Sequence, residues 1–184
     1  MAWTTSAAAT DGNTYRFFRQ ERRNQCGPAA VATLFNLKFG REISVSTVGE
    51  WYIEGEGTVN VNHDHIRDFQ AAGSWYDGTI AALGKLKLYM HATKGFANAG
   101  KWVAKGQAKP AILSVGWYQQ NGAGWVRAGG HWVVAAKLFG QNVICLDPGL
   151  DTGIVEFSTA NPNQYDVDYG TGAQTGWIDG IILP

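Results

Sequence analysis

Four polar residues of types that perform acyl-transfer chemistry lie far apart in this sequence. Gln20 and Cys26 stand near the N-terminal end, whereas His131 and Asp147 stand in the last third of the 184 residues. A thiolate attacks an amide carbonyl, an imidazole moves the proton, a carboxylate orients the imidazole, and a neutral amide stabilises the oxyanion. These four residue types suffice for amide chemistry, provided that the fold brings them together.

Cys26 stands at the predicted start of a helix. Residues 26–38 are nearly all apolar, which is typical of a helix buried in the core. Pro28 suits the first turn, because backbone donors there have no intrahelical partner. Unpaired donors and aligned peptide dipoles at a helix start favour a negative charge, so we expect Cys26 to react as a thiolate. Its N–H would be one oxyanion donor, and Gln20, in an extended segment upstream, would supply the second without adding a charge.

A predicted hairpin would bring Asp147 close to His131. Among the four histidines, His131 is our candidate because it follows two glycines and opens an apolar run typical of a strand. The strand is expected to turn at residues 139–141 and to return over 142–148, with Asp147 opposite or diagonal to His131. Asp147 would then accept a hydrogen bond from one imidazole nitrogen and turn the other nitrogen toward Cys26.

The patterns along the chain predict one α+β domain over residues 1–184, with two lobes. Residues 1–108 are expected to form a mainly helical lobe that packs against a lobe of antiparallel strands, residues 109–184, with the active site between them. Helical patterns occupy residues 26–38, 44–53, 64–72, 79–86 and 94–105. Strands are expected at residues 111–118, 131–138, 142–146, 154–157 and 177–183, separated by glycine-rich turns.

Four short motifs resemble those of a known family. In chain order they are Gln20, Cys26-Gly27-Pro28-Ala29-Ala30, Gly130-His131-Trp132-Val133-Val134 and Asp147-Pro148. Together they are similar to the papain-like cysteine peptidases, and most similar to the branch that removes double-glycine leaders in bacteriocin exporters. The resemblance implies a papain-like fold, with Gln20 as the oxyanion glutamine, Cys26 as the nucleophile, His131 as the general base and acid, and Asp147 as the orienting residue. Gln25 stands where the leader peptidases usually carry an aspartate.

We therefore expect a cysteine peptidase that hydrolyses a peptide or protein substrate and needs no cofactor. The same triad also serves cell-wall amidases, deamidases and transamidases, including secreted bacterial effectors, and a degenerate peptidase fold can simply bind peptides. Gln25, Trp125 and Gly130 are the residues expected to contact substrate. Trp125 lies in the segment 117–125, interpreted either as a loop that shapes substrate access or as a long hairpin connection whose tryptophans cover the core.

The charge balance argues against two classes of partner. Fifteen basic and fifteen acidic residues cancel, and the longest basic cluster is Arg22-Arg23, so we expect neither a nucleic acid nor an anionic membrane surface as a partner. No apolar run approaches the roughly 20 residues that span a bilayer, and residues 1–11 lack the pattern of a signal peptide. We expect a cytoplasmic protein, or one secreted without an N-terminal signal peptide, and leave its oligomeric state open.

The remaining cysteine and histidines are interpreted as structural. Cys145 is expected to pack in the core beside the site rather than to form a disulfide with Cys26. His63 and His65 flank Asp64 at a solvated helix start, which does not make a metal site without a third ligand. His91, in an apolar stretch, is interpreted as a packing residue. No metal is therefore expected.

Overall fold

The structure, a computed structural model, describes residues 2–21, 25–44, 47–48, 91–94 and 110–183. Within these ranges lie the helix α1, nine strands and two further helical residues, 47 and 48. In chain order the elements are β1 (Ala2–Thr5), β2 (Arg16–Arg19), α1 (Cys26–Phe39), β3 (His91–Lys94), β4 (Ala111–Asn121), β5 (Gly124–Phe139), β6 (Asn142–Leu146), β7 (Ile154–Ser158), β8 (Gln164–Asp168) and β9 (Ala173–Leu183).

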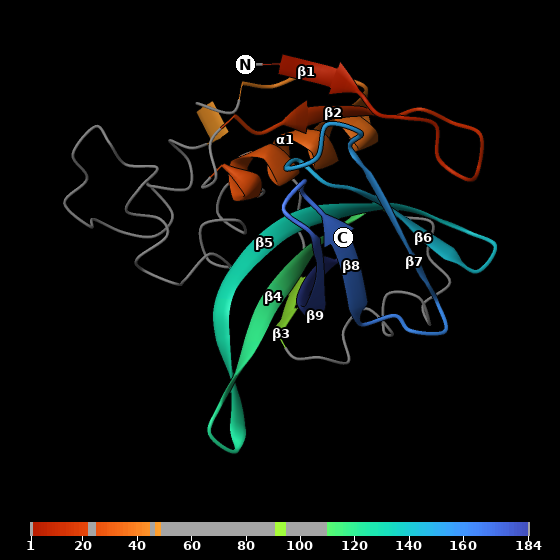
Figure 1. The fold of residues 1–184 in the computed structure, drawn as a ribbon. Coiled ribbons are helices and arrows are strands. Elements are labelled where there is room, and N and C mark those ends of the chain that lie inside the picture. The colour runs from red at the N-terminus through yellow and green to blue at the C-terminus, as the bar shows by residue number, and fades with distance from the viewer. Residues whose placement is uncertain (1, 22–24, 45–46, 49–90, 95–109, 184) are drawn as a thin grey trace.

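Seven of the strands form one antiparallel sheet. Their order is β3-β9-β4-β5-β6-β7, and β8 pairs separately with β9. β1 and β2 form a small second sheet that lies on the far side of α1 from the large one (Figure 1). The described part of the molecule is thus layered, with α1 between the two sheets.

The helix is buried because apolar side chains meet it from both layers. Its first nine residues, 26–34, are all buried. They share a core with Ile112, Val134 and Ile182 of the large sheet and with Phe17 of β2. Each fully buried large apolar side chain contributes about 1.5–3 kcal/mol, so this packing fixes the position of the helix and of the cysteine at its start.

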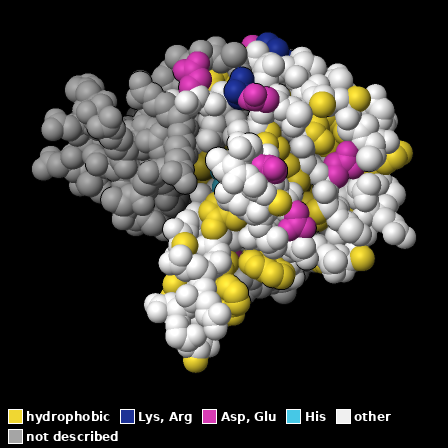
Figure 2. Space-filling model, viewed as in Figure 1, with side chains coloured by type: hydrophobic (Ala, Val, Ile, Leu, Met, Phe, Trp, Pro, Cys, Tyr) yellow, Lys and Arg dark blue, Asp and Glu magenta, His cyan; other side chains and the backbone are white. Residues whose placement is uncertain are grey.

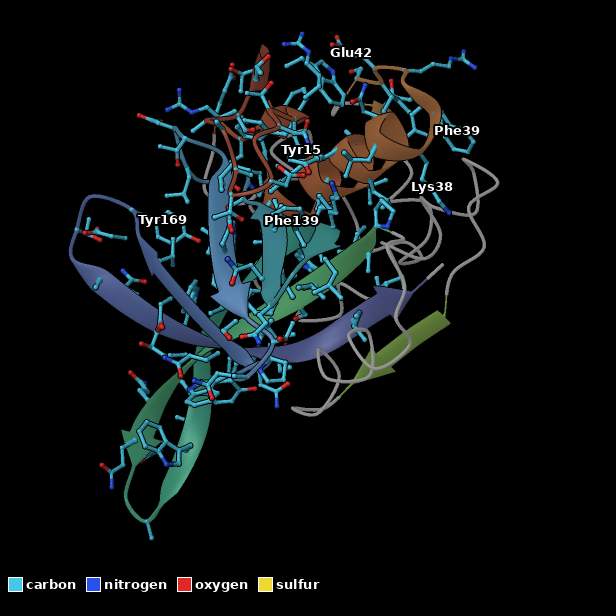
Figure 3. All side chains as sticks on the ribbon, turned by 90° about the vertical axis from the view of Figure 1, so that its right-hand side faces the viewer. Tyr15, Lys38, Phe39, Glu42, Phe139 and Tyr169 are labelled. Atoms are coloured by element: carbon cyan, nitrogen blue, oxygen red, sulfur yellow. The ribbon has the colours of Figure 1, made fainter. Side chains whose placement is uncertain are left out.

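α1 ends in a left-handed cap. Gly40 has a φ of 63°, which a residue with a Cβ rarely adopts, and its N–H donates to the Asn36 carbonyl at 2.7 Å. Figure 3 shows Lys38 and Phe39 at this end of the helix, on the opposite side of the view from Tyr169. Cys26 at the start of α1 is buried, whereas Phe39 at its end is 49% exposed.

The other face of the large sheet carries a second core. Leu113, Val133 and Ile178 point into it from three neighbouring strands, and Tyr165 and Val167 of β8 cover it. β4 and β5 are therefore buried on both faces over most of residues 111–116 and 131–136. Such strands read as continuous apolar runs, and they form a rigid base for residues at their ends.

The strands expected in the second part of the chain are present. Residues 142–146 form β6 as predicted, and the other four expected strands are found within longer ones. Of the two interpretations of residues 117–125, the structure shows the hairpin connection, formed by the end of β4, a tight turn at Gly122 (φ 60°) and the start of β5. Asn121 pairs with Gly124, so Gly122 is the first central residue of the turn, where glycine readily adopts the positive φ that tight hairpins use. The hairpin projects well beyond the rest of the sheet (Figure 1).

The first part of the chain contains strands that the patterns did not predict. β1 and β2 precede the helix, and Lys94, expected to begin a helix, is the last residue of β3. Val48 donates its N–H to the Ser44 carbonyl at 3.1 Å, which is helical spacing. The other residues of the helices expected over 44–53, 64–72, 79–86 and 94–105 lie outside the described ranges, so the helical lobe stays a prediction.

A loop at residues 147–153 ties the sheet to the N-terminal segment. The Gln20 N–H donates to the Pro148 carbonyl at 2.8 Å, and the Ala7 N–H donates to the Thr152 carbonyl at 2.8 Å. Gly153, with a φ of 68°, lies directly against the Phe17 ring. The loop that begins with Asp147 is thus held by the same segment that carries Gln20.

We predict that Gly153→Ala destabilises the protein by about 2–4 kcal/mol. An added Cβ would meet the Phe17 ring at 2.3 Å, and the positive φ adds strain. Gly140→Ala is the matched control, because Gly140 has a φ of 58° with open space around it, and it should cost only about 1 kcal/mol. Urea denaturation measures both, and equal losses would contradict the close packing at Gly153.

Candidate active site

Cys26 is the first residue of α1 and is buried, with 6% of its surface exposed. Gln25 caps the helix, and the first turn contains no acidic residue. The first N–H groups of a helix have no partner within it, and the positive end of the dipole points at them. Cys26 thus stands at the end of the helix where backbone donors are available, and both cysteines are free.

His131 and Asp147 form a buried pair. Nε2 of His131 lies 2.7 Å from Oδ1 of Asp147, and the two side chains are 8% and 0% exposed. His131 stands on β5 where the buried part of that strand begins, and Asp147 follows the last residue of β6. The β5–β6 hairpin, which turns at Gly140, thus brings together two residues that are 16 positions apart.

The side chain of Cys26 is the second group that acts on the imidazole, and it favours the protonated form of His131. Since Nε2 contacts Asp147, the nitrogen left for Cys26 is Nδ1. Burial alone would lower the pKa of His131, but the charges of Asp147 and of the Cys26 thiolate outweigh it and raise the pKa from 6.5 to about 10. The arrangement therefore favours an imidazolium at neutral pH.

Asp147 is completely covered and accepts four hydrogen bonds. Oδ1 receives the His131 imidazole and the Gly149 N–H, the latter at 2.7 Å. Oδ2 receives the hydroxyls of Tyr165 at 2.7 Å and of Tyr169 at 2.9 Å. Burial raises the pKa of this carboxyl, but His131, Tyr165 and Gly149 together lower it below its usual value. A carboxylate with four donors is satisfied in spite of its burial.

Gln20 lies directly after β2, and its backbone is fixed by the bond to Pro148. Its side-chain Oε1 is buried and has no hydrogen-bond partner among the described residues. A buried amide without a partner costs free energy, and this cost is recovered when a ligand group pairs with it. Gln20 is thus a polar group with unused hydrogen-bonding capacity near the start of α1.

The three residues expected to contact substrate have different surroundings. Gln25 is buried, and its Oε1 accepts the Glu21 N–H at 3.1 Å, so it orders the segment before Cys26. Gly130 is exposed, and a Cβ there would meet the guanidinium of Arg127 at 2.2 Å. Trp125 is 69% exposed on the projecting hairpin. The roles of all three residues in substrate binding stay predictions.

The projecting hairpin is notably apolar at its surface. Trp125 and Val126 on β5 and Trp177 on β9 are exposed by 69%, 40% and 41%. In Figure 2 hydrophobic side chains are spread over this hairpin and the adjoining part of the sheet, whereas acidic groups are scattered over the rest of the visible face. The described ranges show no large area of one charge in this view.

Two tyrosines at the site were missed by the sequence reasoning. Tyr165 lies on β8 and Tyr169 lies just after it, and each donates to Asp147. Burial and the Asp147 charge raise the pKa of both phenols, so both remain protonated donors. The alternation of residues 164–168 was a usable signal for a strand with Tyr165 and Val167 on one face. No local sequence pattern indicated that the two tyrosines would contact Asp147.

The residues interpreted as structural fall into two groups. Cys145 is fully buried in the core on the other face of the sheet, as expected, and forms no disulfide. His63 and His65 lie outside the described residues, and of His91 only the backbone, in β3, is described. Across the described ranges no group of three or more potential ligands is arranged to hold a metal ion. Nor does any described helix have the length and apolar character needed to cross a membrane.

Comparison with solved structures identifies the architecture. The chain matches the peptidase domain of Streptococcus ComA, a bi-functional ABC transporter involved in a quorum sensing pathway, with a TM-score of 0.54 at 17% sequence identity. The match covers 92% of this chain and 98% of that chain. The fold is papain-like. The resemblance read from the four sequence motifs is thereby confirmed at the level of the fold.

Two further structures show lower similarity. The peptidase domain of Streptococcus mutans ComA matches with a TM-score of 0.45 at 18% identity, over 92% of this chain and 100% of that chain. The Pseudomonas avirulence protein AvrPphB matches with a TM-score of 0.41 at 12% identity, over 89% and 93%. No protein-family model matches the sequence, and a search of curated proteins gives no significant match.

We predict that Asp147→Asn lowers the pKa of His131 from about 10 to 6.5 or below. Without the carboxylate charge, burial becomes the larger influence and disfavours the imidazolium. The ¹⁵N shifts of the imidazole in an NMR titration measure this change. Asp179→Asn is the control, because Asp179 accepts hydrogen bonds from Ser114, Tyr118 and Arg127 elsewhere on the sheet. Equal titration of His131 in wild type and Asp147→Asn would contradict the assigned cause.

Proposed function

We propose that this papain-like chain is a cysteine peptidase with Cys26 as nucleophile, His131 as general acid and base, and Asp147 as the orienting residue. The observation that carries the proposal is the buried His131–Asp147 pair, whose free imidazole nitrogen is left for the sulfur at the start of α1. Nucleophile, base and orienting group within mutual hydrogen-bond reach are the signature of nucleophilic acyl transfer.

The reaction would proceed through a thioester. The Cys26 thiolate attacks the carbonyl carbon of the scissile peptide bond, and the His131 imidazolium gives its proton to the leaving amine. The neutral imidazole then takes a proton from water, whose oxygen attacks the thioester and releases the acid product. His131 finally holds the proton again and Cys26 is again a thiolate, so the cycle needs no cofactor.

The electrostatics support this division of roles. With a pKa of about 10, His131 carries its proton at neutral pH while the thiolate is opposite, which is the state needed for attack. Asp147 keeps its charge because its pKa is below the usual value, and it holds the imidazolium in one orientation. The carboxylate itself neither gains nor loses a proton during the cycle.

Gln20 and the backbone N–H of Cys26 would stabilise the oxyanion. The side-chain amide oxygen of Gln20 is buried and has no hydrogen-bond partner among the described residues. Rotation about the last side-chain bond exchanges this oxygen with the NH₂ group, which donates to an oxyanion. The Cys26 N–H at the helix start is the natural second donor.

A peptide or protein is the substrate class that the proposal favours. The solved structure that shares the fold is described as a peptidase domain, and a sheet with a free-standing apolar hairpin offers surface for an extended chain. Amidase, deamidase or transamidase activity would use the same residues. Product masses separate these outcomes, because peptide cleavage, loss of ammonia and cross-linking change the mass differently.

We predict that peptide cleavage depends on Cys26 and not on Cys145. Wild type, Cys26→Ala and Cys145→Ala are incubated with a proteome digest, and new peptide termini are identified by mass spectrometry. Wild type and Cys145→Ala should generate the same termini, whereas Cys26→Ala should generate none, because it lacks the nucleophile. Termini that persist in Cys26→Ala would refute the proposed role of the thiol.

Gln20→Ala should lower kcat by about 100-fold or more with a smaller change in KM, because an oxyanion donor acts mainly in the transition state. The control is Gln174→Ala, since Gln174 is exposed on β9 and donates only to Thr171. Steady-state kinetics on a peptide identified in the digest give both constants. A loss in kcat/KM arising from KM alone would assign Gln20 to ground-state binding.

A further inference from the structure

Tyr165 and Tyr169 both donate a hydrogen bond to Oδ2 of Asp147, but they differ in burial and in the contacts of their rings. Tyr165 is fully buried, and its ring packs against Phe157 at a centroid distance of 6.5 Å, away from the imidazole. Tyr169 is partly exposed, and its ring stands edge-on to His131 at 5.8 Å with an interplanar angle of 81°. One phenol is a core residue, and the other lies between the His131–Asp147 pair and solvent.

The position of Tyr169 is built into its surroundings. On its other side the ring contacts Trp117 at 6.4 Å, nearly perpendicular. Gly149 lies close to both rings: a Cβ at this position would be 3.0 Å from the Tyr169 ring and 3.6 Å from the His131 ring. A side chain at position 149 would push the phenol away from the pair. The close approach therefore depends on a glycine two residues after Asp147.

We propose that Tyr169 is a positioning residue: its hydroxyl holds Oδ2 of Asp147 while its ring excludes water from the His131–Asp147 hydrogen bond, keeping the second imidazole nitrogen turned to Cys26. The effect of Tyr169 on catalysis rests on the proposed function. Its effect on the imidazole, which it holds in place and shields from water, does not depend on any substrate.

The hydroxyl also sets how much charge Asp147 presents to His131. A carboxylate that donates electron density to two phenols attracts the imidazolium less strongly than one that is not shared. The other titratable groups whose charges interact with this pair are Tyr165 on β8, Cys145 on β6 and Cys26 on α1, and Glu156 on β7 interacts with Cys145. Removing only the Tyr169 hydroxyl should therefore strengthen the hold of Asp147 on the imidazolium proton.

Two substitutions separate the hydroxyl from the ring. Tyr169→Phe keeps the ring, so the alkaline limb of the kcat/KM profile should move up by about half a pH unit while the Nε2 proton of His131 stays protected. Tyr169→Leu removes the ring as well. In this variant exchange of the Nε2 proton with water, followed by NMR, should accelerate at least about tenfold, and kcat/KM should fall by about the same factor.

Tyr118→Phe and Tyr165→Phe are the controls. Tyr118 donates to Asp179 at 2.9 Å, so its variant loses the same kind of bond away from the site and should change neither exchange nor the pH limb. Tyr165→Phe removes the other hydroxyl from Asp147 without uncovering the ring of His131, so exchange should stay within about twofold of wild type. Urea denaturation of each variant establishes that it is folded under the conditions used.

The outcomes separate this inference from the proposed function. Fast Nε2 exchange in Tyr169→Leu alone supports the positioning role, even if wild type cleaves no peptide and the peptidase proposal fails. Cys26-dependent cleavage combined with unchanged exchange in Tyr169→Leu overturns the positioning role alone. Equal acceleration in Tyr165→Phe and Tyr169→Leu also overturns it, because the effect would then come from the hydroxyl bond and not from the covering ring.

Discussion

The structure depends most on the burial of one charge. Asp147 has no exposed surface, and an isolated carboxylate in that position would be too costly to keep ionised. Its four donors come from β5, from the loop after β6, and from β8 and the residue after it. Displacement of any of these segments would expose the Asp147 carboxylate or remove one of its hydrogen-bond donors. The site is therefore stable only when the large sheet has closed around it, and folding and formation of the site are one event.

The same loop also connects the two halves of the site. Residues 147–153 begin with the orienting carboxylate and continue to Pro148, whose carbonyl receives the N–H of Gln20. Arg19 forms an ion pair with Asp151, and Phe17 covers Gly153. The exposed ion pair contributes little, but the backbone bond and the ring contact are short and well covered. The backbone of Gln20, the proposed oxyanion donor, is thus held by the loop that carries Asp147, although the two residues are 127 positions apart in sequence.

The sequence predicted what is local and missed what depends on distant pairing. The approach of His131 to Asp147 followed from a single hairpin whose strands were recognisable as apolar runs. The approach of Cys26 to that hairpin could not be derived from any local pattern, and only the resemblance of the four motifs indicated it. The tyrosines were out of reach for a different reason: Tyr165 and Tyr169 reach Asp147 only because β8 pairs with β9 and curls over the sheet. The hairpin at Gly122 was one of two interpretations of residues 117–125, and the sequence alone did not decide between it and a loop at the rim of the site.

The two cysteines have different electrostatic surroundings near Asp147. Cys145 lies two residues before Asp147 in the fully buried strand β6, where burial first and then the Asp147 charge raise the pKa of its thiol well above the usual value. Cys26 instead acts on His131, whose imidazole is hydrogen-bonded to Asp147. The proposed nucleophile therefore faces the imidazole, whereas the carboxylate acts directly on Cys145 and disfavours a thiolate there.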